Sequence, residues 1–306
     1  MTPRPTSAAG AVLAVDLGKT TCRLQAVGAT AFHREGPGAR LGYGTDGIAD
    51  VQQAIQTVIQ PAQAELGPGL PAVVGVAGTL QNPQLRAGLA RWLADRLRAP
   101  AAVTSDVVIA HVGALGGGPG VCLIAGTGAI ALGVSTDGRW RAVDGWGPDV
   151  GDLGSGSWIG RSGIVAVLDA LDRGGPTTAL TREEERVRHL VSQAVADPAN
   201  AARTLASFAP FVLDHADAGD RVAGQIAGAA IAQLVRTARA AAFDDSQVAV
   251  LGGLQNQERF AERLAEALTD AGLAPTRPLG GAAHGALLVH QNHRSPLEGC
   301  VERATP

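Results

Sequence analysis

The feature that most constrains the fold is the stretch 121–163, in which two short apolar segments precede a loop that is dense in glycine. The first segment, 121–125, is followed by Gly-Thr-Gly and then by the second segment, 129–134. The dipeptide Asp137-Gly138 comes next, and Asp-Gly is typical of a two-residue turn between antiparallel strands. The pattern predicts a buried strand pair whose first turn carries glycine.

The loop after this strand pair has glycine at five positions, 145, 147, 151, 154 and 156, and it also contains Asp144, Asp149 and Asp152. Glycine is favoured where the backbone bends sharply or where another group approaches it closely. The simple alternative is an ordinary loop with many turns. Because two glycine-containing loops follow one strand pair, we favour a ligand contact. A helical pattern then runs through Leu171.

A second strand-turn-strand pattern begins the chain. Apolar residues 11–15 lead into a polar turn, and residues 22–27 resume an extended pattern. Backbone N–H and hydroxyl groups bind phosphate oxygens, and a carboxylate binds Mg²⁺ directly or through water. The turn therefore suits a phosphate tail, although a polar hairpin turn with Lys19 in solvent explains it equally well. The turn residues are Asp16, Gly18, Lys19, Thr20 and Thr21.

Strands and helices alternate along the chain, which predicts an α/β fold. Apolar runs at 72–76, 101–104 and 247–251 are expected as strands, and helical patterns are expected at 48–66, 83–97, 221–243, 257–271 and from about 284 to about 291. Residues 111–120, with three consecutive glycines, are interpreted as a flexible joint. Ligands of open α/β sheets lie beyond the carboxyl ends of strands, and we expect that place for Asp16, Gly78, Asp106, Thr127 and Asp152.

Length and composition limit the classes of protein. At 306 residues the chain exceeds one typical domain, so two lobes are expected. Hydrophobic residues at 46% and charged residues at 17% suit a globular protein with a large core. The net charge of −3 gives no electrostatic signal for nucleic acid or membrane. Neither a signal peptide nor an apolar run of about 18 residues is found, so a cytoplasmic protein is expected.

These motifs resemble those of the sugar kinase, heat-shock ATPase and actin superfamily. The turn at 16–23 is similar to its first phosphate loop, the turn at 126–128 to its second, and Gly252-Gly253 to its adenosine loop. The string GWGPDVGDLGSGSWIG, residues 145–160, is similar to the N-acetylglucosamine kinase branch of the BadF/BadG/BcrA/BcrD ATPase family. The resemblance covers about residues 11–290.

The resemblance implies a two-lobed actin-like ATPase fold in which each lobe is a ribonuclease-H-like mixed sheet flanked by helices. The expected N-terminal lobe is 1–115, with a C-terminal helix at about 284–306 packing back on it, and the expected C-terminal lobe is 116–283. The resemblance also implies a homodimer.

The implied activity is Mg-ATP-dependent phosphorylation of an amino-sugar hydroxyl, which converts N-acetylglucosamine or glucosamine to its 6-phosphate. Asp106 would be the general base, and Asp16 would hold Mg²⁺ through water. Sugar-binding positions would be Arg40, Gly78, Asp106, Thr127, Gly128, Trp146, Gly147 and Asp152. Nucleotide-binding positions would be Asp16, Gly18, Lys19, Thr20, Thr21, Gly126, Thr127, Gly252 and Gly253.

Two departures from the family pattern leave the sugar open. The family's first loop usually has glycine where Lys19 stands and often lysine where Thr21 stands. Near residues 36–38 the family usually offers an asparagine to the sugar, whereas this chain has Ala39 followed by Arg40. An arginine suits an acidic substituent, such as the lactyl group of N-acetylmuramic acid. It is equally compatible with a surface position.

Other functions remain as alternatives. The ATPase activator of a 2-hydroxyacyl-CoA dehydratase needs cysteines that hold an iron–sulfur cluster. Cys22, Cys122 and Cys300 do not form such a pattern. A non-catalytic sugar sensor is expected to carry an N-terminal helix-turn-helix, and only about ten residues precede the first strand. An actin-like filament protein is disfavoured by the sugar-site string. His284 is interpreted either as a contact to the nucleotide base or as a partly buried capping residue.

Overall fold

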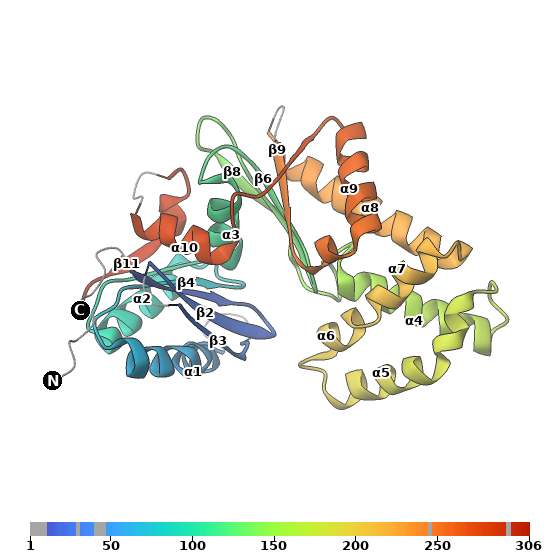
Figure 1. Cartoon of the computed structure of the whole chain (residues 1–306), viewed down its shortest axis with the longest axis horizontal. Coiled ribbons are helices and arrows are strands. Elements are labelled where there is room, and N and C mark those ends of the chain that lie inside the picture. Colours follow the sequence, from blue (N-terminus) through green and yellow to red (C-terminus); the bar gives the residue numbers. More distant parts are fainter. Residues whose placement is uncertain (1–10, 29–30, 40–46, 244–246, 292–294) are drawn as a thin grey trace. The chain divides into compact units, whose positions relative to one another are not determined.

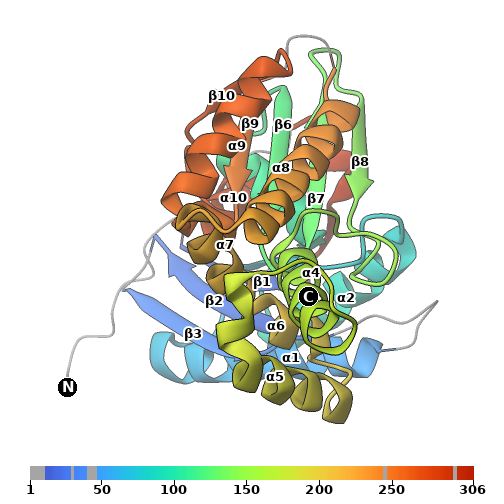
Figure 2. The same cartoon turned by 90° about the vertical axis from the view of Figure 1, so that its right-hand side faces the viewer.

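The structure is a computed structural model that describes residues 11–28, 31–39, 47–243, 247–291 and 295–306. The chain forms two units, one from Met1–Gly118 together with Pro278–Pro306 and the other from Pro119–Arg277. Each unit is built on one β-sheet (Figures 1 and 2). Within the described residues, no helix is both long and apolar enough to cross a membrane.

The sheet of the first unit combines an antiparallel meander with parallel strands. The meander consists of β1 (Val12–Leu17), β2 (Thr21–Val27) and β3 (Phe32–Pro37). Next to β1 lie two parallel strands, β4 (Ala72–Val76) and β5 (Ala101–Thr104). A short strand, β11 (Glu302–Ala304), pairs antiparallel with β5 at the edge. The strand order is β11-β5-β4-β1-β2-β3.

Helices cover both faces of this sheet (Figure 1). Alternate β1 residues, Leu13 and Val15 among them, enter one core with α1 (Ile48–Leu66) and α2 (Pro83–Leu97). The opposite face contacts α3 (Asp106–Leu115) and α10 (Ala282–Gln291). Because side chains alternate along a strand, Asp16 lies on the α3 and α10 face.

The second unit repeats the strand order of the first. An antiparallel meander of β6 (Gly120–Ala125), β7 (Ala129–Val134) and β8 (Trp140–Asp144) is followed by two parallel strands, β9 (Gln247–Leu251) and β10 (Ala274–Thr276). The order β10-β9-β6-β7-β8 corresponds to β5-β4-β1-β2-β3. Two mixed sheets with the same topology agree with the expected fold.

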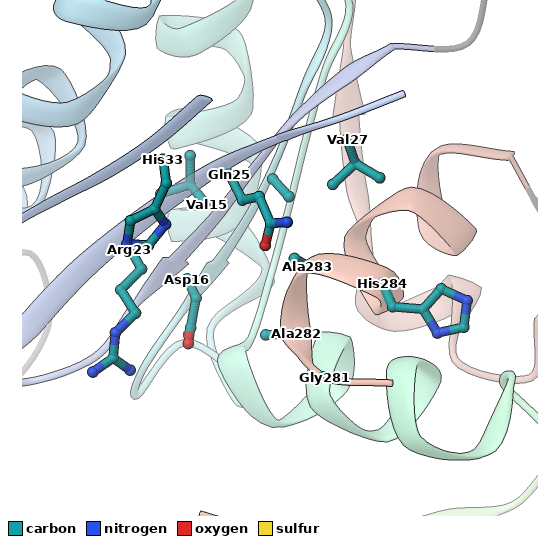
Figure 3. Close-up of a pocket in the computed structure, with 11 residues that line it drawn as sticks. Val15, Asp16, Arg23, Gln25, Val27, His33, Gly281, Ala282, Ala283 and His284 are labelled. Carbon is teal, nitrogen blue, oxygen red and sulfur yellow. The ribbon is translucent and has the colours of Figure 1, made fainter. Parts of the chain in front are cut away.

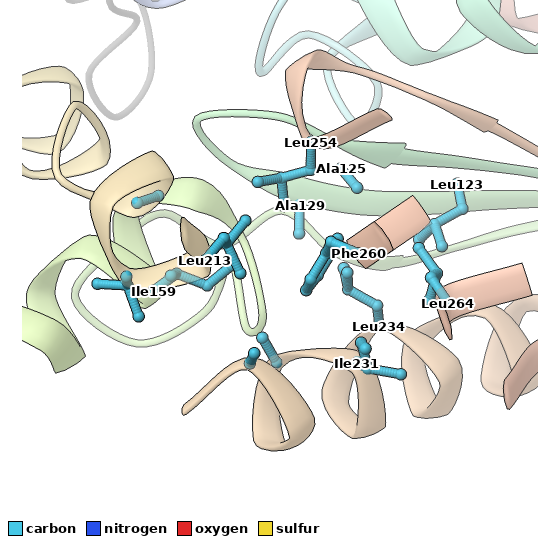
Figure 4. Close-up of a cluster of buried hydrophobic side chains, with 14 of the residues drawn as sticks. Leu123, Ala125, Ala129, Ile159, Leu213, Ile231, Leu234, Leu254, Phe260 and Leu264 are labelled. Carbon is cyan, nitrogen blue, oxygen red and sulfur yellow. The ribbon is translucent and has the colours of Figure 1, made fainter. Parts of the chain in front are cut away.

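The core of the second unit is formed where helices meet β6 and β7 (Figure 4). Leu123 and Ala129 of these strands belong to one buried cluster with Ile231, Leu234 and Phe260. Glycine permits a close approach at Gly133, where an added Cβ would overlap the carbonyl oxygen of Ala241. The helices are α4 (Gly156–Asp172), α5 (Glu184–Ala196), α6 (Ala201–Ala206), α7 (Ala209–Asp217), α8 (Arg221–Ala241) and α9 (Glu258–Asp270), with short 3₁₀ turns at Ala179–Glu183 and Gly253–Asn256.

Two expectations for the first unit need correction. Residues 111–115 of the expected joint belong to helix α3, and Gly113 lets this helix pack against α10, since a Cβ there would overlap the carbonyl oxygen of Gly281. The boundary between the units falls in the remaining part of that segment, after Gly118. The last helix ends at Gln291, as its apolar pattern predicts, but residues 302–304 form strand β11, so the helix implied up to 306 is wrong. Pro296 prevents the helix from continuing through this segment.

Asp220 joins two helix starts in the second unit, which leads to a stability prediction. Its carboxylate accepts hydrogen bonds from Ala223 N at 2.8 Å, Ala179 N at 2.6 Å and the Thr178 hydroxyl at 3.0 Å. Burial opposes the charge, yet these bonds hold the pKa of Asp220 below its ordinary value. We expect Asp220→Ala to lower the free energy of unfolding by about 1–2 kcal/mol, the scale of a lost N-cap. Urea unfolding measures this loss, and an equal loss in exposed Asp217→Ala would contradict it.

Candidate functional site

Three strand ends of the first unit bring together most of its predicted site residues. Strands β1, β4 and β5 are parallel, so their carboxyl ends lie at the same edge of the sheet. Asp16 is near the end of β1, Gly78 follows β4, and Asp106 follows β5 as the first residue of α3. Ala77 N donates to Leu17 O at 2.8 Å, which joins the first two of these ends.

The turn between β1 and β2 is tight, and residues 38 and 39, which follow β3, pack against it. Gly18 N donates to Thr21 O at 2.9 Å, and Ala39 N donates to Gly18 O at 3.2 Å. Gly38 packs against this turn so closely that a Cβ would overlap Thr21 N. The predicted phosphate-loop residues Gly18, Thr20 and Thr21 are partly buried, whereas Lys19 is exposed.

Gly75 explains why Asp16 and Asp106 are neighbours. Gly75 pairs with Asp16 in the parallel ladder of β1 and β4. A Cβ on Gly75 would lie only 3.1 Å from the Cα of Asp106, so glycine lets the start of α3 approach the sheet beside Asp16. The Asp106 carboxylate accepts hydrogen bonds from Val107 N at 2.8 Å and from the Ser105 hydroxyl at 2.9 Å.

Both carboxylates have raised proton affinity. Burial, followed by repulsion from Asp106, raises the pKa of Asp16 to about 6, and the guanidinium of Arg23 opposes the shift. Burial also raises the pKa of Asp106, against the hydrogen bonds from Ser105 and Val107 and the charge of Lys19. Poorly solvated carboxylates that repel each other are typical of functional sites, because a bound cation or a reacting proton relieves their cost.

A pocket of about 470 Å³ adjoins Asp16 (Figure 3). It lies between the β1–β3 strands and the first turn of α10. Asp16 and Arg23, which are direct cross-strand partners, extend in the same direction from their strands (Figure 3). The ring of His284 points away from them, and its Nδ1 lies 3.2 Å from Gly113 O. His284 therefore contacts α3, which favours the capping interpretation.

In the second unit the turn at 126–128 lies beside the loop that contains Gly252 and Gly253. Strands β6 and β9 are parallel, and the turn 126–128 and Gly252 follow their carboxyl ends. Gly252 has a φ of +110° and packs against Ala125 O with no space for a Cβ. The start of α4 also contacts the first turn, because Gly156 N donates to Gly126 O at 2.7 Å and Ser157 N to Thr127 O at 3.1 Å. Gly253 begins the 3₁₀ turn after β9.

Asp152 lies against the first of these turns. Its side chain is buried, its Oδ1 accepts from Ala129 N at 3.3 Å, and its Oδ2 is 2.8 Å from where a Cβ of Gly128 would be. Trp146 and Gly147 belong to the same loop as Asp152, and Trp146 is 79% exposed. The second unit thus brings together the 126–128 turn, Asp152 and Gly252. Arg40 lies outside the described residues.

The sequence analysis gave no role to two residues that contact the loops of the candidate site, Arg86 and Asp144. Arg86 is almost fully buried on α2, and its Nη1 donates to Thr79 O at 2.6 Å and to Leu80 O at 2.8 Å. It thereby fixes the loop that carries Gly78. The sequence does contain a sign of this role, because Arg86 stands among the apolar positions of the predicted helix 83–97, where a buried arginine needs hydrogen-bond partners. Asp144 is the second such residue, and its three partners are described below.

The acidic pair fits a hard cation. Mg²⁺ prefers oxygen ligands and usually keeps several waters, with one or two carboxylates and substrate phosphates completing its shell. Asp16 and Asp106 provide carboxylates whose pKa values are raised by burial, and a bound cation would offset the cost of their charge. In the described part of the chain, no group of three or more His, Cys, Asp or Glu residues forms a metal site made of protein alone.

Residues 13–289 match the model of the BadF/BadG/BcrA/BcrD ATPase family. An N-acetyl-D-glucosamine kinase of Dictyostelium discoideum is 33% identical over 147 residues, which cover 46% of this chain and 44% of the relative. An N-acetylmuramic acid/N-acetylglucosamine kinase of Clostridium acetobutylicum is 40% identical over 78 residues, which cover 26% of each. The matched segments thus span less than half the length of these curated relatives.

Solved structures extend the likeness to the whole fold. A candidate N-acetylglucosamine kinase from Chromobacterium violaceum has a TM-score of 0.71 at 28% identity and covers 91% of this chain and 98% of its own. A second candidate, from Porphyromonas gingivalis, has a TM-score of 0.74 at 21% identity, with 92% and 99% covered, and shows the shared fold. The expected fold class is confirmed, and the chain belongs to the BadF/BadG/BcrA/BcrD ATPase family.

Proposed function

We propose that this protein is an ATP-dependent kinase that transfers phosphate to a hydroxyl of an amino sugar, with N-acetylglucosamine or glucosamine converted to its 6-phosphate. The observation that carries the proposal is the partly buried pair of Asp16 and Asp106 at one sheet edge, both with raised pKa values. The names of the relatives support the sugar class.

Asp106 is assigned as the general base. It accepts the proton of the sugar hydroxyl as the oxygen attacks the γ-phosphorus of ATP, and ADP leaves. A base works best when its pKa lies near the working pH, and burial moves the pKa of Asp106 in that direction. Its position as the first residue of α3, fixed by Ser105 and Val107, gives it a defined orientation.

The nucleotide contacts are assigned to the glycine-containing turns. Gly18, Thr20 and Thr21 offer backbone N–H and hydroxyl groups to phosphate oxygens, with Lys19 adding a positive charge. Asp16 would hold Mg²⁺ through water, and a bound Mg²⁺ neutralises charge on the transferred phosphate. In the second unit the corresponding assignments are Gly126, Thr127, Gly252 and Gly253.

The sugar contacts are assigned to Gly78 in the first unit and to Gly128, Trp146, Gly147 and Asp152 in the second. Asp152 is suited to hold sugar hydroxyls, because its carboxylate is buried against the 126–128 turn and accepts from Ala129 N. The exposed ring of Trp146 offers an apolar face on the same loop. We propose that the two units are the two lobes of the kinase.

The substrate assignment is tested with a panel of sugars in the presence of Mg-ATP, read by ADP release. We expect N-acetylglucosamine or glucosamine to have a kcat/KM at least about tenfold above that of glucose, since a polar group that the site recognises is worth roughly 1–2 kcal/mol. A kcat/KM for glucose above that of every amino sugar would exclude amino sugars as the substrate class. Mass spectrometry of the product, compared with a 6-phosphate standard, checks the position.

N-acetylmuramic acid is the second candidate substrate, because one relative carries that name. If N-acetylmuramic acid is the best substrate of the panel, Arg40→Ala should reduce activity on it far more than on N-acetylglucosamine.

The dehydratase activator is less well supported as a function, since Cys22, Cys122 and Cys300 are all buried and free. A non-catalytic sugar sensor would release no ADP in the same panel.

We also propose that the protein is a cytoplasmic homodimer without nucleic-acid or membrane partners. Light scattering, which measures the molar mass in solution, tests the dimer.

A further inference from the structure

The carboxylate of Asp144 gathers three backbone N–H groups of the loop that carries Asp152. Its Oδ1 accepts from Gly145 N at 2.8 Å and from Asp152 N at 2.7 Å. Its Oδ2 accepts from Leu153 N at 2.9 Å. Hydrogen bonds to an ionised carboxylate are among the stronger ones in proteins. One side chain therefore closes a loop of irregular backbone at both of its ends.

Asp144 is itself anchored to the sheet. It is the last residue of β8 and pairs with Ile130 of β7. The loop approaches it closely at Gly151, where a Cβ would lie 2.6 Å from Asp144 Oδ1 and 2.8 Å from the Cβ of Trp146. A second bond within the loop, from Gly151 N to Gly147 O, measures 2.8 Å. The loop is thus folded around the Asp144 carboxylate.

Asp152 needs this support because its backbone is unfavourable. Its φ of +53° lies in the left-handed region, which costs a residue other than glycine about 1–2 kcal/mol. The bond from its N–H to Asp144 holds it there. This conformation places the Asp152 carboxylate against Gly128 and Ala129 N.

We infer that Asp144 is a positioning residue that sets the orientation of Asp152, and with it the grip of the protein on the sugar. The inference rests on the proposed function, in which Asp152 holds sugar hydroxyls. Asp144 offers both carboxylate oxygens to backbone groups, so it acts on the substrate only through the loop.

The first test measures the loop without substrate. In Asp144→Asn the amide places an N–H₂ group where one acceptor oxygen stood, so at least one loop N–H loses its partner. Hydrogen exchange followed by mass spectrometry should show about tenfold faster exchange in the peptide covering 145–153, the scale of one lost bond. Unchanged exchange would overturn the inference. Because no activity is needed, this result is independent of whether the proposed function holds.

The second test measures the consequence for the sugar. We expect Asp144→Asn to raise the sugar KM about tenfold with kcat nearly unchanged, because a displaced Asp152 loses contacts present in both ground and transition states. Asp144→Asn added to Asp152→Asn should then raise KM little further, since both changes remove the same contact. Full additivity, or an unchanged KM in an active enzyme, would also overturn the inference.

Asp149→Asn is the matched control. It removes a charge from the same loop, but its side chain is 93% exposed, and its ion pair with Arg161 is long, at 3.8 Å. Such a pair contributes little to stability. We expect wild-type exchange and KM. If Asp144→Asn does not fold, Gly151→Ala is measured instead, because its Cβ intrudes on the same carboxylate from the loop side. The same faster exchange and higher KM are expected, and wild-type values would overturn the inference.

Discussion

Asp106→Asn is expected to lower the kcat of sugar phosphorylation by ~100-fold or more, the scale of a lost general base, while sugar and ATP bind almost as in the wild type. The amide is close in shape to the carboxylate but does not accept the hydroxyl proton. An amide oxygen can still accept from Val107 N, which bonds Asp106 Oδ1 in the wild type, so the start of α3 is retained.

Steady-state kinetics, paired with calorimetric titrations of sugar and nucleotide, separate this role from a structural one. If Asp106 served only to cap α3, its substitution would reduce stability and leave kcat intact. Asp95→Asn, an exposed position on α2 in the same unit, is the control and should behave as wild type. Wild-type turnover by Asp106→Asn would show that the base is another residue.

Asp16→Asn is expected to remove nearly all Mg-ATP-dependent activity, roughly 100-fold or more, and at the same time to stabilise the ligand-free protein at pH 8. In the wild type, burial and the repulsion by Asp106 raise the pKa of Asp16 from 3.8 to about 6, so the charged form is costly in the folded state. The neutral amide removes that cost together with the metal-binding charge.

The pH dependence of stability gives this prediction its sign. A folded-state pKa above the unfolded value means that the folded protein binds the proton of Asp16 more tightly than the unfolded chain. The wild type is therefore most stable relative to Asp16→Asn below about pH 4, loses this advantage as pH rises to about 6, and stays at the lower level above it. The whole change is about 3 kcal/mol, because one pKa unit corresponds to about 1.4 kcal/mol.

Urea unfolding at pH 4.5 and pH 8, without nucleotide or Mg²⁺, measures this difference. A wild-type protein that is as stable as Asp16→Asn at both values would show that Asp16 carries no buried charge. Asp106→Asn provides an internal check. It removes the repulsion on Asp16, so the acid-side change of stability should move to lower pH.

The elements that could be predicted from the sequence are those with a strong local signal. Helix α1 has apolar residues at helical spacing, and α2 has Asn82 as N-cap followed by Pro83, so both were predicted with their observed bounds. Strand β3 was missed because Phe32 is its only buried residue, and its other side chains are largely polar and exposed. Three-residue strands such as β11 are too short to show any period.

The candidate site was predictable only in part, for a related reason. Residues at strand ends, such as Asp16 and Asp106, can be identified once the strands are known. Their mutual repulsion depends on Gly75, which is placed beside Asp16 by the register of a non-local ladder. The bonds of Asp144 likewise join residues eight and nine positions apart through a loop without a repeating pattern.

The discontinuity of the first unit has a consequence for biosynthesis. The chain leaves this unit at Gly118 and returns to it only at Pro278. The ribosome therefore synthesises every residue of the second unit before it makes α10 and β11, and domains generally fold as units during synthesis. During this interval the sheet that carries Asp16 and Asp106 lacks α10 on one face and lacks β11 at one edge. Exposed apolar faces and unpaired strand edges promote aggregation, so this interval is where chaperone binding is expected to matter most for the yield of active protein.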